Sequence, residues 1–189
     1  MTLKTPSQIT LTHFQFENII IWRHADAEQA DAAGGDYDVM RQLTSKGKTQ
    51  AKHMARWLRQ HLPKGTKVVC SPAIRALQTA EALSYKIQTN DSLKPSAGLV
   101  EVLRALAQLD EHPHILIVGH QPWLGQLVSF LFEQTVSEHT ETIVNNLSKY
   151  NNTSIKKGAV WWLRLRPNET TSSPNLTYQL FTVQTPSLL

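Results

Sequence analysis

Four basic side chains in three separate motifs have the chemistry needed to hold and transfer a phosphoryl group. Arg23 and His24 stand together in "WRHADAE", Arg75 lies in "CSPAIRALQTA", and His120 lies in "VGHQPW". Guanidinium groups are planar, permanently charged donors that match phosphate oxygens. A neutral imidazole can attack phosphorus and form a covalent phosphohistidine that water later hydrolyses. We therefore predict phosphoryl transfer with His24 as the nucleophile, while the other three side chains bind and orient the phosphoryl group.

Three short apolar runs rich in β-branched residues predict the buried strands that must position these side chains. The arginines and histidines follow the runs closely in the chain. Because the carboxyl ends of parallel strands meet at one edge of a sheet, we expect the four side chains to converge there. The runs are residues 19–22, 67–70 and 114–118.

Helical patterns separate these strands. Apolar residues recur at helical spacing in residues 51–62, 99–106 and 124–131. The first of these helices has Thr44 or Ser45 as its cap, and another is expected with Ser71 as N-cap, Pro72 at its first position and an end near Tyr85. Strands that alternate with helices predict an α/β fold of three layers, a mostly parallel sheet with helices on both faces.

The remainder of the chain completes one predicted domain. Residues 159–165 and 176–183 predict two strands joined by a Pro/Asn/Ser-rich connection, as a hairpin that closes one edge of the sheet. Residues 133–157 are polar and predict no firm element. A chain of 189 residues with 41% hydrophobic content suits one globular domain, which we place at residues 18–189 after an N-terminal extension of residues 1–17.

Composition argues against several classes of protein. The 19 basic and 15 acidic residues are scattered without a Lys/Arg block, so nucleic-acid binding is not expected. No apolar run approaches the ~20 residues of a membrane span, and no secretory leader is visible. The single Cys70 cannot form an internal disulfide. We therefore expect a cytoplasmic protein that binds neither nucleic acid nor membranes.

The same motifs also carry a family resemblance. "IWRHADAE", "RQLTSKGKTQA", "VVCSPAIRALQTA", "LIVGHQPWLGQLV" and "KKGAVWWL" resemble, in order, successive motifs of the histidine phosphatase superfamily, in particular its short phosphohistidine phosphatases of the SixA kind. The resemblance covers residues 18–165. It implies a phosphoglycerate-mutase-like fold, phosphorylation of His24, and a phosphate pocket made by Arg23, Arg75 and His120. It also implies that no metal and no cofactor takes part.

Two departures from the family pattern stand out. Ala25 replaces a glycine that usually follows the histidine, a one-methyl change that we expect the backbone to accommodate. Many relatives also supply a carboxylate general acid from a segment after the second helix, whereas "LKPSAGLVEVL" has no acid between Leu93 and Val100. The candidates left are Asp26, Glu28 and Glu101, with Asp26 foremost, although Asp26 is equally suited to hold a turn.

Several functions remain open at this stage. The leading interpretation is a phosphatase for a phosphohistidine protein, so that the partner is a phosphorylated protein or a small phosphorylated metabolite. The alternatives are a small-molecule phosphomonoesterase of the same superfamily, a module that binds phosphate without hydrolysing it, and a metal-dependent phosphoesterase. The last is disfavoured because the His112 and His114 pair lacks further ligands in the sequence.

Overall fold

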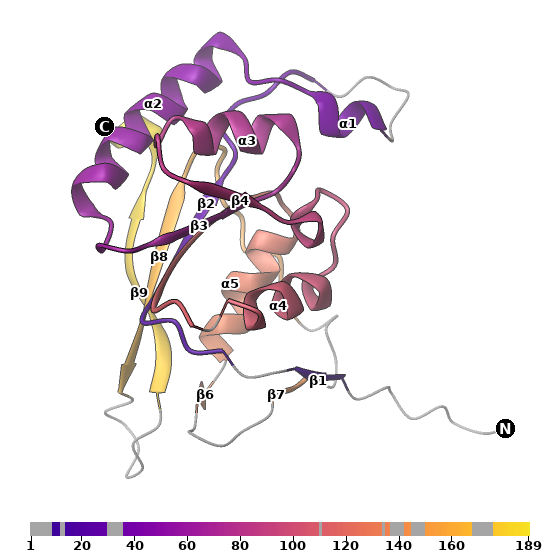
Figure 1. Cartoon of the computed structure of the whole chain (residues 1–189), viewed down its shortest axis with the longest axis vertical. Coiled ribbons are helices and arrows are strands. Elements are labelled where there is room, and N and C mark those ends of the chain that lie inside the picture. Colours follow the sequence, from indigo (N-terminus) through magenta and orange to yellow (C-terminus); the bar gives the residue numbers. More distant parts are fainter. Residues whose placement is uncertain are drawn as a thin grey trace, which may run out of the picture.

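The computed structural model describes residues 9–11, 14–29, 36–109, 111–133, 135–136, 142–144, 150–167 and 176–189. A seven-stranded sheet in the order β4-β3-β5-β2-β8-β9-β6 forms its centre, with helices on both faces (Figure 1). The strands of this sheet are β2 (Asn18–Arg23), β3 (Lys67–Cys70), β4 (Ile87–Thr89), β5 (His114–Gly119), β6 (Thr135–Val136), β8 (Val160–Pro167) and β9 (Leu176–Gln184). The helices are α1 (Asp36–Met40), α2 (Ser45–His61), α3 (Ile74–Glu81), α4 (Leu99–Ala107) and α5 (Trp123–Glu133).

The strand directions confirm the predicted α/β architecture. β2, β5, β3 and β4 are paired in parallel, while β8 pairs antiparallel with β2 and β9 antiparallel with β8. The last two strands therefore pair as predicted, but they do not close the sheet, because β6 pairs with the outer side of β9. The connection between them, residues 168–175, lies outside the described residues.

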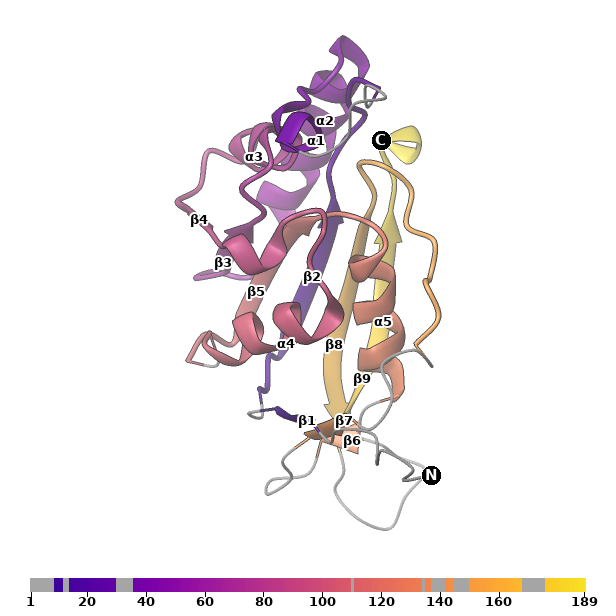
Figure 2. The same ribbon diagram turned by 90° about the vertical axis from the view of Figure 1, so that its right-hand side faces the viewer.

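The central strand β2 is buried on both faces, which is why its sequence reads as a continuous apolar run. Ile20 and Trp22 belong to the core layer beneath α2 and α3. Ile19 and Ile21 point the other way, into the layer formed with α4 and α5. Figure 2 shows these two helix pairs on opposite sides of the sheet.

The predicted start of α3 is wrong. The helix begins at Ile74 with Ala73 as its N-cap residue, and it ends at Glu81 rather than near Tyr85. The Ser71 hydroxyl accepts a hydrogen bond from the Ala73 backbone N–H, and it also contacts His120, which follows the end of β5. By contrast, Thr44 caps α2 as predicted, accepting a hydrogen bond from the backbone N–H of Gly47.

Several helices and strands of the structure were not predicted from the sequence. They include α1, β4 and a separate two-stranded sheet of β1 (Ile9–Leu11) and β7 (Thr142–Val144). In Figures 1 and 2 this small sheet lies at the end of the molecule far from α1. Phe14 and Phe16 pack into the core beside α4 and α5, so residues before Asn18 contribute to the core.

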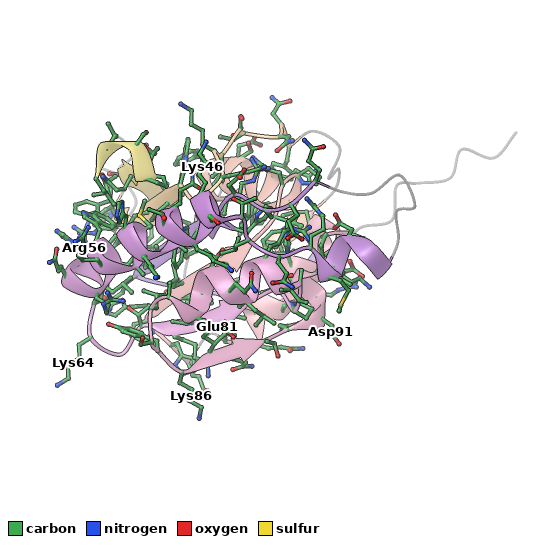
Figure 3. All side chains as sticks on the ribbon, turned by 90° about the horizontal axis from the view of Figure 1, so that it is seen from above. Lys46, Arg56, Lys64, Glu81, Lys86 and Asp91 are labelled. Carbon is green, nitrogen blue, oxygen red and sulfur yellow. The ribbon has the colours of Figure 1, made fainter. Side chains whose placement is uncertain are left out.

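The described surface carries charges of both signs on many elements. Figure 3 shows Lys46 and Arg56 on α2 and Lys64, Glu81, Lys86 and Asp91 at other points around the molecule. Among the helices that the structure describes, none combines the length and apolar character needed to cross a membrane.

Candidate active site

The four basic side chains predicted to act together are brought to one edge of the sheet. The register pairs Arg23 with Gly119, so β2 and β5 end side by side, and the His24 backbone N–H donates to the Gly119 carbonyl at 3.0 Å. The rings of His24 and His120 have centroids 5.1 Å apart. Arg75 reaches the same place from the first turn of α3, and its charge acts on both histidines.

The tautomer of His24 is fixed by its own backbone. Its Nδ1 lies 2.8 Å from the Ala25 carbonyl oxygen, which can only accept, so Nδ1 carries the proton. The lone pair is therefore on Nε2. The His24 side chain is buried, which excludes most of the water that would compete for this lone pair. These features suit Nε2 to attack an electrophile.

Ala25 fits this arrangement without strain. Among the described non-glycine residues, the positive φ is at Ser84, so Ala25 stays in an ordinary backbone conformation. Its backbone N–H donates to the Thr79 hydroxyl at 3.1 Å, and that hydroxyl donates to the Arg75 carbonyl at 2.6 Å. The expected accommodation of the methyl group is confirmed, and the segment after His24 is tied to the helix that carries Arg75.

Ser71 belongs to the site, although the sequence predicted it to be a helix N-cap. Its Oγ lies 2.7 Å from Nε2 of the buried His120. Oγ accepts from the Ala73 N–H and still carries a proton that it can donate to His120 Nε2. With Ser71 as the donor the imidazole proton of His120 is on Nδ1, and with His120 as the donor it is on Nε2. In the sequence the Ser71–Pro72 pair favours a helix-cap interpretation, and a contact with a residue 49 positions away has no signal of its own.

Each of the two site arginines is held at the far end of its guanidinium group. Arg23 Nη1 donates to the Ile155 carbonyl at 2.6 Å. Arg75 Nη1 donates to the main-chain carbonyl of Asp38, and its Nη2 pairs with Asp38 Oδ2 at 2.8 Å. In both arginines the Nε–H is left out of these contacts.

Three buried nitrogens of the site remain without partners. Among the described side chains, the buried nitrogen and oxygen atoms that make no hydrogen bond within the protein are Arg23 Nε, Arg75 Nε and His120 Nδ1. A buried donor without a partner is costly, so natural proteins rarely contain one unless a ligand satisfies it. The His120 ring lies beside the His24 ring, and the charges of Arg23 and Arg75 act on His24. Two guanidinium N–H groups and an imidazole nitrogen without partners suit an anion with several oxygens.

Burial keeps both histidines neutral. Desolvation lowers the pKa of His24 to about 3, and the charges of the nearby arginines act in the same direction. The hydrogen bond to the Ala25 carbonyl opposes this shift. Desolvation, followed by the interaction with His24 and the charges of the same arginines, lowers the pKa of His120 to about 2. Within the described residues, no group of three or more His, Cys, Asp or Glu side chains has the arrangement of a metal site.

These shifts predict an unusual pH dependence. An exposed histidine has a pKa of ~6.5, so we expect the ¹³Cε1 signals of His24 and His120 to stay at their neutral positions down to about pH 4. Signals that move near pH 6.5 would contradict the burial argument. Because only the unfolded chain takes up these protons below pH 6.5, the free energy of unfolding should fall as pH decreases through that point.

Asp26 comes close to the site but is engaged elsewhere. Its Oδ1 pairs with Lys157 Nζ at 2.9 Å, and its Oδ2 accepts from the Thr44 hydroxyl at 2.9 Å. The hydrogen bond from Lys157, opposed by desolvation and aided by Thr44, lowers the Asp26 pKa. An ionised carboxylate with these partners has no proton to donate near neutral pH.

The other two acid candidates also have partners of their own. Glu101 Oε2 accepts from the Gly98 N–H at 2.9 Å and so caps α4. Glu28 is exposed and accepts from the Gln42 N–H at 3.3 Å. The buried Cys70 packs in the core, and desolvation, with the charge of Glu81, raises its pKa strongly, which is opposite to what a thiolate nucleophile needs.

Comparison with known proteins places this geometry in a family. The profile of the Histidine phosphatase superfamily (branch 1) matches residues 19–102. The phosphohistidine phosphatase SixA of Escherichia coli strain K12 is 31% identical over 121 residues, which cover 60% of this chain and 73% of that protein. The chain belongs to the histidine phosphatase superfamily. A SixA homolog of Haemophilus influenzae is 28% identical over 155 residues, 73% of this chain and 92% of the homolog.

Solved structures show the same fold for this histidine phosphatase. A protein histidine phosphatase SixA complexed with tungstate has a TM-score of 0.64 at 24% identity, covering 90% of this chain and 98% of that one. The alpha-ribazole phosphatase of Shigella flexneri has a TM-score of 0.59 at 18% identity, covering 86% and 95%. The predicted phosphoglycerate-mutase-like architecture is therefore confirmed. Since the fold is shared by phosphatases with different names, the substrate must be argued from the site.

Proposed function

We propose that this histidine phosphatase hydrolyses phosphohistidine in a protein substrate through a covalent intermediate on His24. The observation that carries the proposal is the set of three unpaired nitrogens, which are all donors when His120 Nδ1 is protonated, in the same site as an imidazole whose Nε2 lone pair is free. Arg23, Arg75 and His120 each offer one of these donors. The name of the E. coli relative, a phosphohistidine phosphatase, supports the same substrate.

The proposed reaction has two displacements at phosphorus. In the first, the lone pair of His24 Nε2 forms a bond to phosphorus while the bond from phosphorus to the substrate imidazole breaks. In the second, a water oxygen attacks the same phosphorus, the bond to His24 breaks, and inorganic phosphate leaves with neutral His24 restored. The three unpaired donors stabilise charge on the phosphoryl oxygens in both transition states.

A committed general acid is not needed for this substrate. The leaving imidazole takes a proton at a pKa of ~6.5, so solvent can supply it. Asp26, the foremost acid candidate in the sequence, is assigned here to positioning: it links Lys157 to the cap of α2 and so holds the loop that follows His24. Gly47 allows α2 to approach the Asp26 backbone closely, because a Cβ at position 47 would lie 1.8 Å from the Asp26 carbonyl oxygen.

We further propose that catalysis requires no divalent metal, because the arginines supply the positive charge that metals supply in other phosphoesterases. The test is hydrolysis of a phosphohistidine protein and of p-nitrophenyl phosphate in excess EDTA. Turnover should equal that of the untreated enzyme, because no step of the proposed mechanism uses a metal. Loss of activity that one added metal restores would favour a metal-dependent phosphoesterase, and phosphate binding without turnover would favour a non-catalytic module.

A further inference from the structure

Asp38 lies between two arginines at the edge of the site. α1 presents its carboxylate so that Oδ2 pairs with Arg75 Nη2 at 2.8 Å and Oδ1 pairs with Arg41 Nη2 at 2.6 Å. Arg41 Nε also donates to Oδ1 at 2.9 Å. A third donor of Arg41, Nη1, is held by the Glu28 carbonyl at 2.8 Å. The carboxylate is thus a bridge between α1, the segment after it and α3.

The contact with Asp38 holds the terminal end of the Arg75 guanidinium group. Both terminal nitrogens of Arg75 are engaged by Asp38, one by the main-chain carbonyl and one by the carboxylate. The Nε is the nitrogen of this guanidinium that has no partner within the protein. Arg23 is held at one terminal nitrogen, Nη1, by the neutral Ile155 carbonyl, and its Nε is likewise unpaired. Asp38 therefore orients Arg75 without covering its Nε–H.

A carboxylate at this place also creates a problem for an anionic ligand. Its pKa is held below the ordinary value, since the hydrogen bonds and charges of Arg75 and Arg41 outweigh desolvation, so it carries a negative charge. If Arg23 and Arg75 were the only cations of the site, the carboxylate of Asp38 would reduce its net charge to one positive charge. Arg41 is close enough to influence both histidines, and it restores the net charge to two. A phosphoryl dianion carries two negative charges.

We propose that Asp38 is a positioning residue that fixes Arg75 for phosphate binding, and that Arg41 offsets the charge of Asp38 so that the site matches a dianion. This inference rests on the proposed function and adds two residues that lie outside the pocket predicted from the sequence. Hydrogen bonding and charge are separable here, because Asp38→Asn removes the charge but keeps an acceptor oxygen, whereas Asp38→Ala removes both.

The test is a double-mutant cycle read by binding. Isothermal titration calorimetry of the full chain with inorganic phosphate, at fixed ionic strength and pH 7.5, gives Kd without requiring turnover. Arg41→Met should weaken binding roughly tenfold, because it leaves the Asp38 charge uncompensated. Asp38→Asn should not weaken phosphate binding. The Kd of Asp38→Ala for phosphate should be higher than that of Asp38→Asn by about threefold or more. The double variant Asp38→Asn/Arg41→Met has two net positive charges again and should return to within about threefold of wild type.

Two further variants keep the test decisive. Arg41→Lys retains the charge and should bind phosphate nearly as wild type, even if Arg41→Met folds poorly. Arg56→Met removes one positive charge from the end of α2 away from α1, where Figure 3 shows the side chain at the surface, and should leave Kd unchanged. A double variant that binds no better than Arg41→Met, or Asp38→Asn as weak as Asp38→Ala, would overturn the inference. Failure to trap a phosphoenzyme would contradict only the proposed function, since the cycle measures binding.

Discussion

Replacing His24 by alanine is expected to abolish turnover, with a loss on the order of 10⁴-fold or more, as when other enzymes lose their nucleophile. The reason is geometric. His24 Nε2 carries the lone pair because Nδ1 is committed to the Ala25 carbonyl, and neighbouring His120 contacts Ser71 through its own Nε2. No second imidazole is placed in the same way among the side chains that the structure describes.

The measurement is a rapid quench after brief exposure to a labelled phosphohistidine protein. Wild type should retain phosphate in a form that is labile to acid and stable to base, and the His24→Ala variant should retain none. His61→Ala is the matched control, because His61 is exposed on α2 and bonds to the Trp57 carbonyl at 2.7 Å. Label that persists in His24→Ala would remove His24 from the mechanism.

The second large effect concerns the substrate. We expect kcat/KM for a phosphohistidine protein to exceed that for a phosphoserine peptide by about 10²-fold to 10⁴-fold, the contribution of a general acid that the proposed mechanism lacks. Expulsion of an alcohol produces an oxygen anion almost as basic as hydroxide, whose conjugate acid has a pKa of ~15.7. An aryl phosphate, with a better leaving group, should fall between the two.

The Asp26→Asn variant tests whether the site lacks a general acid, as proposed, or whether Asp26 is that acid. The variant loses the charge that pairs with Lys157 but retains an acceptor for Thr44, so positioning should be only partly affected. A loss below about tenfold, equal for all three substrates, is expected for a positioning role. Equal turnover of the phosphoserine peptide by wild type, together with a large selective loss of that activity in Asp26→Asn, would identify Asp26 as the acid.

The sequence by itself determined the α/β class, the long helices and the convergence of Arg23, His24, Arg75 and His120. Those features are local: α2 repeats its apolar residues over 17 positions, and each site residue lies at the end of a buried strand, directly after it, or in the first turn of the next helix. Parallel pairing then brings strand ends together whatever the loops contain. Short elements such as α1, with five residues, and β4, with three, have too few positions to show a period.

Only the tertiary structure decided which partner each functional group has. Ser71 contacts His120 across 49 positions of the chain, Asp38 meets Arg75 across 37, and Lys157 reaches Asp26 across 131. Hydrogen bonds of this kind have no sequence period, and a polar residue such as Ser71 has several local partners of similar energy, including a helix cap. Burial selects among them, because a polar group taken from water is costly unless it finds a partner. In this site the selection leaves Arg23 Nε, Arg75 Nε and His120 Nδ1 without a partner in the protein.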